Sequence, residues 1–514
     1  MSLQDACNEL IEKIKSGAIT SQASLEKEKV LISKKYMLDK IIKNADIMAF
    51  ADDEKIRKFL LTKPTRTLSG VANIAVMWMN KKSCIGSCIY CPQGEYIDTK
   101  GVRLVPKSYT GSEPATMRAL RLNYDPYLQV QNRLKQLKAI GHPTDKCELI
   151  IMGGTFMLMS KKYQEQFVQR CLDAFNKSES KTLAEAQKKN ESAANRCIGL
   201  TIETRSDYCK KAHIKQMLKL GCTRVELGVQ STDDKILKKI KRNHGTRENI
   251  YAIRLLKEAG LKVCAHWMPG LTGLEKMNLK KELRLFKALF LPDYMPDELK
   301  IYPTLVIQGT KLYELWNNGK YKELTIDQAS DLLIAMKKIV PPYTRIKRIM
   351  RDISEKEVAA GPATTNLRQL TNVKMAKLGI SCNCIRCREV GIKGKLPEKV
   401  TLNKIEYNAS GGKEIFLSFE DMKNKILLAF LRLRIDKDKI AKVRELHVYG
   451  PMIELGKQGG YQHKGLGKKL LSEAEELSKK HEKHKIQVTS GIGAREYYRK
   501  LGYKLESSYM TKKI

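Results

Sequence analysis

The sequence predicts an α/β protein with a parallel-stranded partial (β/α)6 barrel, followed by a smaller α/β domain. Two observations lead to this fold class. Apolar runs of strand length alternate with helical segments from about residue 71 to 340, as in parallel sheets with crossover helices. A second strand–helix pattern begins near residue 401, after a basic stretch without clear periodicity. We therefore divide the 514 residues into an arm (1–70), a barrel domain (71–340), a linker (341–400) and a C-terminal domain (401–514).

The arm is polar and basic, and its apolar residues recur at helical spacing over residues 6–17 and 34–50. Residues 63–70, "KPTRTLSG", combine Lys63 and Arg66 with proline and glycine, which predicts a loop or an extended strand of chain. The arm could be only a linker, or it could place these two cations against a nucleic acid.

The barrel domain should contain six strands, each a continuous apolar run of the kind found in strands covered on both faces. The runs lie at residues 71–80, 147–154, 197–204, 223–231, 261–270 and 298–307. Helices are expected at residues 161–175, 212–221, 247–260 and 279–290, and residues 178–196 read as a helical surface insertion. Ligands of such barrels bind at the carboxyl ends of the strands. The candidates at these ends are Gly153, Gly154, Glu203, Gln230, Ser231 and His266.

The linker carries two dense groups of side chains. Arg345, Lys347, Arg348 and Arg351 are candidates for contacts with phosphate groups. The cysteines of "SCNCIRC" follow, and a basic segment with few strands favours a structural zinc ion as their ligand. These cysteines are Cys382, Cys384 and Cys387, and three free thiols are the alternative. The local sequence supplies no fourth ligand.

The C-terminal domain is predicted to contain strands at residues 414–421, 426–435 and 444–455, then a helix over 465–481, a strand over 485–490 and a helix over 494–502. Between the third strand and the first helix lies "YQHKGLG", a glycine loop that opens a helix. Backbone N–H groups at such a point bind a pyrophosphate. The loop contains Tyr461, Gln462, His463, Gly465 and Gly467.

Composition limits the partners. The formal net charge is +39, which favours a polyanion such as nucleic acid over a merely lysine-rich surface. No run of eighteen apolar residues and no apolar leader is present, so we expect neither a membrane span nor secretion. Thirteen cysteines without a leader indicate reduced thiols and metal ligands in a cytoplasmic protein.

A first cysteine trio, Cys84, Cys88 and Cys91, follows the first barrel strand directly. The spacing Cys-x3-Cys-x2-Cys suits three corners of a [4Fe–4S] cluster, whose fourth iron would stay open for a small molecule. Zinc with a distant fourth ligand such as His142 or His213 is almost equally compatible with the spacing alone. The position at the ligand-binding end of a barrel strand favours the cluster.

This spacing after a first barrel strand resembles the signature of the radical S-adenosylmethionine superfamily. The resemblance implies that Gly153 and Gly154 in "MGGT" face the methionine part of S-adenosylmethionine. It places Glu203, Gln230 and Ser231 near ribose and adenine.

The C-terminal domain resembles the GNAT acetyltransferase fold, in which the strand before the glycine loop pairs with acetyl-coenzyme A. Tyr497 and Tyr498 fall where that family often places a hydroxyl near the thioester, so both are catalytic candidates. The alternative for two adjacent tyrosines is ordinary packing.

The whole chain from about residue 60 is similar to the catalytic subunit of Elongator and its archaeal relatives. The stretches that carry this similarity are "KSYTGSEPATMRAL", "IMGGTFM", "ELKIYPTLVI", "SCNCIRCREVG", "ELHVYG" and "REYYRKLGYK". The resemblance implies a tRNA-modifying enzyme that makes 5-carboxymethyluridine at the wobble position, with a [4Fe–4S] cluster, S-adenosylmethionine, acetyl-coenzyme A and Zn²⁺. It further implies an electron donor, the anticodon arm of tRNA as partner, and possible Elongator-like subunits.

The same resemblance assigns side chains to acetyl-coenzyme A, and one of them lies in the barrel domain, so the thioester site would straddle both domains. These residues are Lys146, Glu445, Leu446, His447, Val448, Tyr461, Gln462, His463 and Tyr498. Lys300 ends a barrel strand and is a catalytic candidate or a surface charge. One departure is Pro92–Gln93–Gly94, where the family commonly has Pro-Gly-Gly.

Two other functions fit parts of the sequence. A protein lysine acetyltransferase, for example on histones, would keep the cluster as a structural element and would not need S-adenosylmethionine. A non-catalytic tRNA-binding subunit would bind tRNA without turnover.

Overall fold

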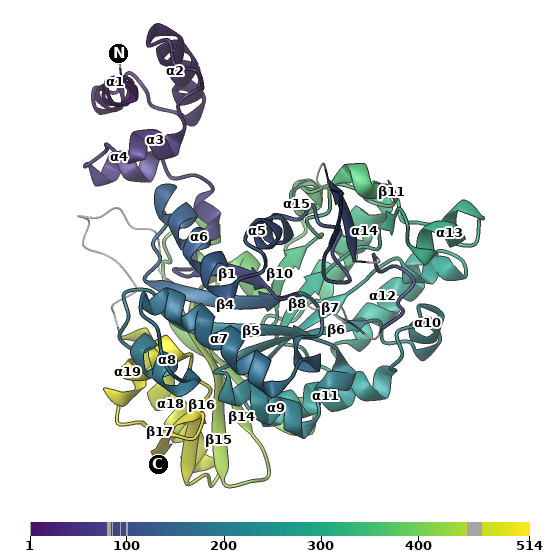
Figure 1. Ribbon diagram of the computed structural model, residues 1–514. Helices are drawn as coiled ribbons and strands as arrows, with labels where there is room; N and C mark the ends of the chain where they lie inside the picture. Colours follow the sequence, from purple (N-terminus) through teal and green to yellow (C-terminus); the bar gives the residue numbers. More distant parts are fainter. Residues whose placement is uncertain (1, 80–83, 85, 93, 99–100, 450–464) are drawn as a thin grey trace.

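The computed structural model describes residues 2–514 except 80–83, 85, 93, 99–100 and 450–464. The chain forms a small helical lobe and two seven-stranded sheets (Figure 1). Each of the three parts has its own buried apolar cluster. None of the helices in the described part of the chain is long and apolar enough to cross a membrane.

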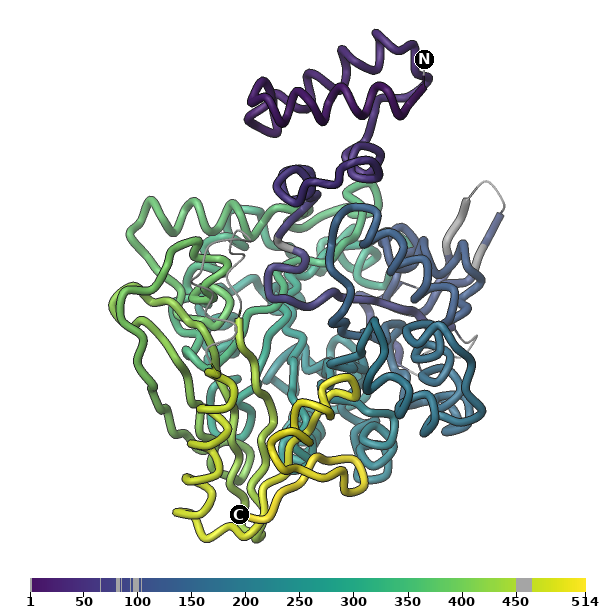
Figure 2. Tube along the Cα trace, turned by 90° about the vertical axis from the view of Figure 1, so that its left-hand side faces the viewer, coloured from purple at the N-terminus to yellow at the C-terminus, as the bar shows by residue number. Residues whose placement is uncertain are grey.

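The amino-terminal lobe stands off from the two sheets, as both views of the chain show (Figures 1 and 2). Its helices are α1 (Leu3–Lys15), α2 (Gln22–Lys35), α3 (Asn44–Met48) and α4 (Glu54–Phe59). The predicted single helix over 34–50 is wrong, because α2 ends at Lys35 and α3 begins only at Asn44. Met37 has a left-handed backbone with φ 51°, and the Ser33 hydroxyl accepts a 3.0 Å bond from the Ile42 N–H, which fixes a turn there.

The barrel sheet is parallel throughout, with strand order β1-β4-β5-β6-β7-β8-β10. It is an open half-barrel, because β1 and β10 each pair on one side only. The strands are β1 (Ala72–Met77), β4 (Lys146–Met152), β5 (Arg196–Thr204), β6 (Arg224–Gln230), β7 (Lys262–Trp267), β8 (Glu298–Ile301) and β10 (Arg345–Ile349). The six predicted strands are all present.

Most helices of this domain pack on the outer face of the sheet, where their apolar residues join the largest buried cluster. The helices of the barrel domain are α5 (Pro114–Arg121), α6 (Pro126–Ala139), α7 (Lys161–Asn176), α8 (Leu183–Asn190), α9 (Lys211–Lys219), α10 (Asp234–Lys239), α11 (Thr246–Glu258), α12 (Leu279–Ala288), α13 (Lys311–Asn317) and α14 (Ile326–Ile339). Two small ribbons complete the domain, β2 (Glu95–Asp98) with β3 (Gly101–Leu104), and β9 (Val306–Ile307) with β11 (Val358–Ala360).

The seventh strand, β10, comes from the segment that the sequence analysis assigns to an irregular basic linker. Ile346 and Ile349 are buried, whereas Arg345 and Lys347 are partly buried and paired with carboxylates. Since those partners come from distant parts of the chain, the charges of β10 are neutralised in a way that its own sequence does not show. After β10 the chain forms α15 (Leu367–Lys377), α16 (Ile385–Arg388) and α17 (Val390–Lys393).

The C-terminal sheet has strand order β12-β13-β14-β15-β16-β18-β17. The strands are β12 (Thr401–Ala409), β13 (Gly412–Asp421), β14 (Ile426–Ile435), β15 (Ile440–Val448), β16 (Lys485–Val488), β17 (Lys504–Glu506) and β18 (Tyr509–Lys513). The helices are α18 (Leu466–Lys480) and α19 (Arg495–Arg499). Among the described residues of this domain, only β15 and β16 are parallel neighbours, and their pairing stops at Val443 and Val488. β16 ends at Val488, whereas β15 continues to Val448.

The C-terminal domain is seated on the barrel. Ile492 is 1% exposed and belongs to the apolar cluster of the barrel domain. A Cβ atom on Gly493 would come within 2.5 Å of the Arg196 side chain and 3.1 Å of its backbone, so only glycine permits this approach. Glu191 of the barrel domain accepts bonds of 3.2 and 2.8 Å from Arg495 and Arg499. The two sheets are therefore joined by both apolar and ionic contacts.

Candidate functional site

The structure places two pockets at opposite ends of the half-barrel. One pocket, which we call the carboxyl pocket, lies at the carboxyl ends of the barrel strands and has a volume of about 160 Å³. The other, the amino pocket, lies at the amino ends of the same strands, faces the C-terminal domain and has a volume of about 730 Å³.

The first cysteine trio lines the carboxyl pocket. Cys84, Cys88 and Cys91 all contribute to its wall. Burial raises the pKa of the Cys91 thiol to about 11, and the Ser108 hydroxyl, 3.2 Å from its sulfur, opposes that shift. The three cysteines therefore lie at the end of the barrel where the sequence predicted them.

Each of the three sulfur atoms has a donor within reach. The Gly86 N–H lies 3.3 Å from Cys84 Sγ, and the Arg242 guanidinium lies 3.6 Å from Cys88 Sγ. Arg242 is buried and also donates a 2.7 Å bond to the Gly228 carbonyl. Donors aimed at thiolate sulfurs, together with a buried cation, stabilise an anionic cluster. The donor set therefore fits three corners of a [4Fe–4S] cluster.

The two histidines named for the alternative zinc site already have hydrogen-bond partners in the described part of the chain. Both ring nitrogens of His142 are already occupied, one 2.8 Å from the Thr67 hydroxyl and the other 3.0 Å from the Thr62 carbonyl. His213 Nδ1 accepts a bond from its own helix start at Lys210. Among the described residues, Cys84, Cys88 and Cys91 do not all lie within 4.8 Å of one another, and neither histidine joins them in such a group.

Three of the five residues expected near S-adenosylmethionine line the carboxyl pocket, namely Gly154, Glu203 and Gln230. Glu203 accepts a 2.8 Å hydrogen bond from the Tyr109 hydroxyl, which fixes the direction of its carboxylate. Sequence reasoning missed Tyr109 because it lies in no strand.

The other two residues of that set have local roles. Gly153 has φ 121°, and a Cβ atom there would lie 2.9 Å from the Trp78 carbonyl, so this glycine permits close packing behind the pocket. The Ser231 hydroxyl accepts a 3.3 Å bond from the Asp233 N–H at the start of α10.

Lys300 faces the carboxyl pocket and is not a surface charge. Its ammonium forms an ion pair with Glu226, whose side chain is fully buried, and His266 lies 3.3 Å from the same carboxylate. Although burial opposes it, the Glu226 carboxylate raises the pKa of Lys300, so this lysine carries a charge at neutral pH. Glu226 was not a candidate from the sequence, because a carboxylate in the middle of a barrel strand gives no local signal.

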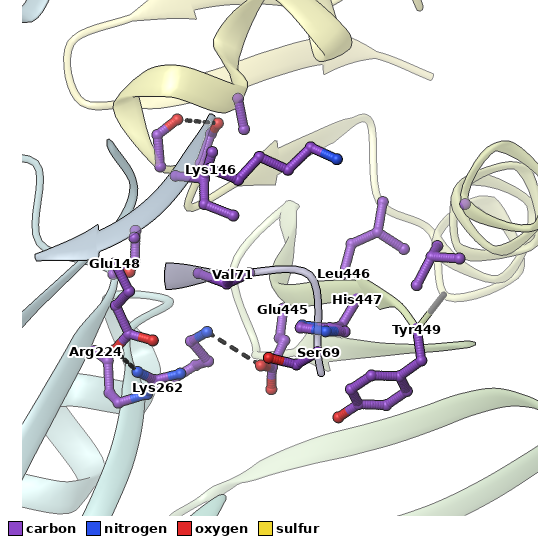
Figure 3. A pocket seen from close by; sticks show the side chains of 18 of the residues that line it. Ser69, Val71, Lys146, Glu148, Arg224, Lys262, Glu445, Leu446, His447 and Tyr449 are labelled. Carbon is purple, nitrogen blue, oxygen red and sulfur yellow. Dashed lines mark hydrogen bonds and ion pairs between the residues drawn. The ribbon is translucent and has the colours of Figure 1, made fainter. Parts of the chain in front are cut away.

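The amino pocket is formed by both domains, as the expected thioester site requires. Lys146 extends across it from β4, and Glu445, Leu446 and His447 line it from β15 (Figure 3). Lys262 of β7 lies 3.1 Å from the Glu445 carboxylate and joins the two walls. The end of β15 and the residue that follows β16 both reach this pocket, because Val448 and Thr489 line it.

The described part of the glycine loop also lines this pocket. Gly465 has φ 72° and precedes the first turn of α18, whose free N–H groups point out of the helix. Gly467 allows close packing, because a Cβ atom there would lie 2.9 Å from the Tyr497 hydroxyl and 3.4 Å from Val448. The candidates Tyr461, Gln462 and His463 lie outside the described residues.

The two tyrosine candidates and His447 all line this pocket. Tyr497 and Tyr498 both line it, with their rings edge to face at 5.2 Å, and burial raises the pKa of Tyr498. Burial lowers the pKa of His447 to about 4, so its imidazole is neutral near pH 7.

The basic candidates for phosphate contacts fall into separate groups. Lys63 and Arg66 are exposed, and Arg66 borders the amino pocket. Arg348 and Arg351 line the carboxyl pocket.

Arg345 and Lys347 instead line the amino pocket and are paired with protein groups. The Arg345 guanidinium donates bonds of 2.7 and 2.8 Å to the Tyr449 hydroxyl and the Glu389 carboxylate. Their charges are therefore largely neutralised inside the protein. These carboxylate partners were not predicted from the sequence.

The second cysteine trio forms a compact group away from both pockets. The sulfur atoms of Cys382, Cys384 and Cys387 lie within 4.8 Å of one another, and Cys384 is fully buried. Residue 385, which follows Cys384, donates a 3.0 Å backbone bond to the Thr344 carbonyl just before β10. Three clustered thiols suit zinc, and the group would tie the linker to the barrel edge.

Sequence profiles of known families match four segments of the chain. The ELP3 N-terminal domain matches residues 3–68, the Radical SAM superfamily 82–286, the Radical_SAM C-terminal domain 296–377 and the acetyltransferase (GNAT) domain 455–513. The tRNA uridine(34) acetyltransferase of Methanocaldococcus infernus is 50% identical over 495 residues, which cover 92% of this chain and 91% of that protein. Elongator complex protein 3 of Homo sapiens is 40% identical over 540 residues, which cover 100% of this chain and 97% of that protein. The chain belongs to the Elongator complex protein 3 family.

A solved structure from this family has the same fold. The archaeal Methanocaldococcus infernus Elp3 lacking residues 1–46 superimposes with a TM-score of 0.76 and 46% identity, covering 87% of this chain and all of that one. The partial barrel with a C-terminal GNAT domain, predicted from the sequence, is thereby confirmed for this member of the Elongator complex protein 3 family.

Proposed function

We propose that this protein modifies tRNA by building a 5-carboxymethyl group on the wobble uridine, using acetyl-coenzyme A and S-adenosylmethionine. The observation that carries the proposal is that one half-barrel has a three-thiol pocket at one end and a GNAT-lined pocket at the other. The relatives named tRNA uridine(34) acetyltransferase support the nature and position of the target base.

The carboxyl pocket is proposed to hold a [4Fe–4S] cluster on Cys84, Cys88 and Cys91, with S-adenosylmethionine beside it. Held by these thiols, such a cluster would supply the single electron for reductive cleavage of S-adenosylmethionine into methionine and a 5′-deoxyadenosyl radical. The chain's own groups then orient the ligand. Glu203, held by Tyr109, accepts bonds from ribose hydroxyls, and Lys300 supplies a fixed positive charge at the base of the pocket.

The amino pocket is proposed to bind acetyl-coenzyme A. The first N–H groups of α18, behind Gly465, face the pyrophosphate, and Lys146 adds a positive charge at the rim. Neutral Tyr498 holds its proton at neutral pH, so its hydroxyl can donate to the departing coenzyme A sulfur. His447, neutral above about pH 4, accepts or donates one hydrogen bond without adding charge.

The net charge of +39 supports a folded tRNA as substrate, with the exposed Lys63 and Arg66 and the pocket residues Arg348 and Arg351 as phosphate contacts. C5 of uridine is buried between stacked bases, so the base must leave the stack to enter a pocket. We further propose that a one-electron donor reduces the cluster and that the second trio binds Zn²⁺. The protein would act in the cytoplasm, with or without Elongator-like subunits.

The test is an anaerobic reaction of the reconstituted enzyme with tRNA, acetyl-coenzyme A, S-adenosylmethionine and dithionite. We expect 5′-deoxyadenosine and 5-carboxymethyluridine, both lost in Cys88→Ala. The proposal fails if neither product forms with an intact cluster. Acetylation of protein lysines that survives Cys88→Ala and needs no S-adenosylmethionine would instead identify a protein acetyltransferase. Tight tRNA binding without any product would identify a binding subunit.

A further inference from the structure

The two pockets lie on either side of a layer of side chains inside the half-barrel. On β6, Arg224 lines the amino pocket and Glu226 lines the carboxyl pocket, and on β8 Glu298 and Lys300 divide in the same way. Residues two apart on a strand share a face. The wall between the pockets is therefore about one layer of side chains thick.

This wall, which we call the barrel partition, consists of Glu148, Thr201, Glu226, Cys264 and Lys347. Lys347 Nζ lies 3.3 Å from Glu148 and 3.8 Å from Glu226. The Thr201 hydroxyl donates a 2.7 Å bond to Glu148, and the Cys264 sulfur lies within 4.8 Å of a Glu226 carboxylate oxygen.

The partition is charged, unlike the interior of a closed parallel barrel. Interiors of parallel barrels are normally filled by bulky branched apolar side chains. Buried ion pairs stabilise a protein no better than well-packed apolar residues of the same volume. A charged layer between two cavities therefore has a reason other than stability.

Lys347 is the member that can move. It lies on β10, an edge strand, and its side chain is 18% exposed, against 0% for Glu226. Its three carboxylate contacts, including Glu298, are all between 3.3 and 3.9 Å, so none of them is a short ion pair.

The other charges do not depend on Lys347 alone. Lys300 pairs with Glu226, and Arg224 pairs with both Glu148 and Glu298. When Lys347 swings away, every carboxylate in the wall keeps a cation.

We propose that the barrel partition is a gate, opened by Lys347, through which the acetyl thioester of acetyl-coenzyme A in the amino pocket reaches the carboxyl pocket. This inference rests on the proposed function, because it supplies the path that the reaction requires. The acetyl methyl gives a hydrogen atom to the 5′ carbon of the deoxyadenosyl radical. One C–H bond breaks homolytically, one forms, and the unpaired electron stays on the acetyl carbon. The radical itself comes from S-adenosylmethionine and one electron from a low-potential reductant.

The first experiment measures opening without turnover. Cys264 is buried within the partition, so its modification by methyl methanethiosulfonate reports how often the layer opens. A mixed disulfide forms on its sulfur and methanesulfinate leaves. The reaction is run on the holoprotein and mapped by mass spectrometry. The variant Lys347→Met/Glu148→Gln removes one cation and one anion and leaves Arg224–Glu298 and Lys300–Glu226 paired.

We expect methyl methanethiosulfonate to modify Cys264 at least fivefold faster in this double variant than in the parent protein. Acetyl-coenzyme A should slow the modification. The matched control is Lys311→Met/Glu314→Gln, an exposed ion pair on α13, which should label at the parental rate. Equal rates of Cys264 modification in Lys347→Met/Glu148→Gln and in the parent protein would overturn the proposal of a gate.

The second experiment follows the hydrogen atom. Lys347→Trp fills the gate, whereas Lys347→Arg keeps its charge. With trideuterated acetyl-coenzyme A, we expect Lys347→Trp to transfer deuterium into 5′-deoxyadenosine at least tenfold more slowly than Lys347→Arg. Both variants are compared at saturating acetyl-coenzyme A, with the dissociation constant of each measured by calorimetry.

Folded Lys347→Trp that transfers deuterium at the parental rate would show that the acetyl group arrives by another route. If Lys347→Trp does not fold, the labelling of Cys264 still decides the matter. Absence of deuterium transfer in the parent enzyme contradicts the proposed function itself, whereas failure in the variants alone concerns the gate.

Discussion

Arg444 of the C-terminal sheet donates a 2.8 Å hydrogen bond to Asp297, the residue directly before β8 of the barrel. Both side chains are fully buried, and Arg444 also donates a 2.8 Å bond to Glu414. Asp297 in turn accepts a 2.9 Å bond from the Val263 N–H at the start of β7. One arginine thus connects the C-terminal sheet to the end of the barrel that bears the amino pocket.

Removing this arginine should destabilise the protein strongly. In Arg444→Met, Asp297 and Glu414 lose their main cation while they remain buried, and breaking a buried pair in this way costs about 3–5 kcal/mol. Urea unfolding followed by intrinsic fluorescence measures the loss. The control is Lys257→Met at the same cluster. Burial lowers the pKa of Lys257 to about 8, so it is the least firmly charged cation there, and its loss should cost much less. Equal effects of the two variants would contradict this account.

The two cysteine trios should bind different metals. Replacing Cys84, Cys88 and Cys91 with alanine should remove iron and visible absorption and leave zinc unchanged, because these thiols line the carboxyl pocket. Replacing the second trio should remove zinc and leave iron. Elemental analysis of anaerobically purified protein checks both variants. Iron that disappears with the second trio would show that the two assignments are reversed.

The hydroxyl of Tyr109 should matter for S-adenosylmethionine although it lies outside the expected motifs. Tyr109→Phe removes the 2.8 Å bond to Glu203, and a hydrogen bond to a charged group contributes about 1.5–3 kcal/mol. We expect the dissociation constant of S-adenosylmethionine to rise roughly tenfold or more, as measured by calorimetry. Tyr251→Phe, at a half-exposed helix position, is the control and should bind normally. Unchanged binding in Tyr109→Phe would place the ribose elsewhere.

His447 should make the stability of the protein pH-dependent in acid. Burial lowers its pKa from 6.5 to about 4, so between these values the unfolded chain binds more protons than the folded one. Stability from this group is therefore complete above about pH 6.5 and declines as pH falls toward 4. In His447→Gln the denaturation midpoint should fall less steeply over that range. A slope identical to that of the parent would mean that His447 is not the titrating group.

Much of the fold was predictable because buried parallel strands are continuous apolar runs, as at 147–154 and 197–204. The carboxyl-end position of the first cysteine trio followed from the same pattern. β10 was not predictable, since its alternating Arg345, Ile346 and Lys347 look like a basic loop until the carboxylates of other strands are placed beside them. The charged barrel interior was missed for the same reason, because pairing between distant residues leaves no local trace.

The position of β10 also limits how the protein can be dissected. The strand comes after the residue where the sequence would place a domain boundary, and it pairs with β8 and lies next to the cysteine-bearing linker. A fragment ending at residue 340 would leave the edge of β8 unpaired. A fragment beginning there would contain β10 without its partner strand. Complementation with separately expressed halves should therefore succeed only if the cut falls beyond β10.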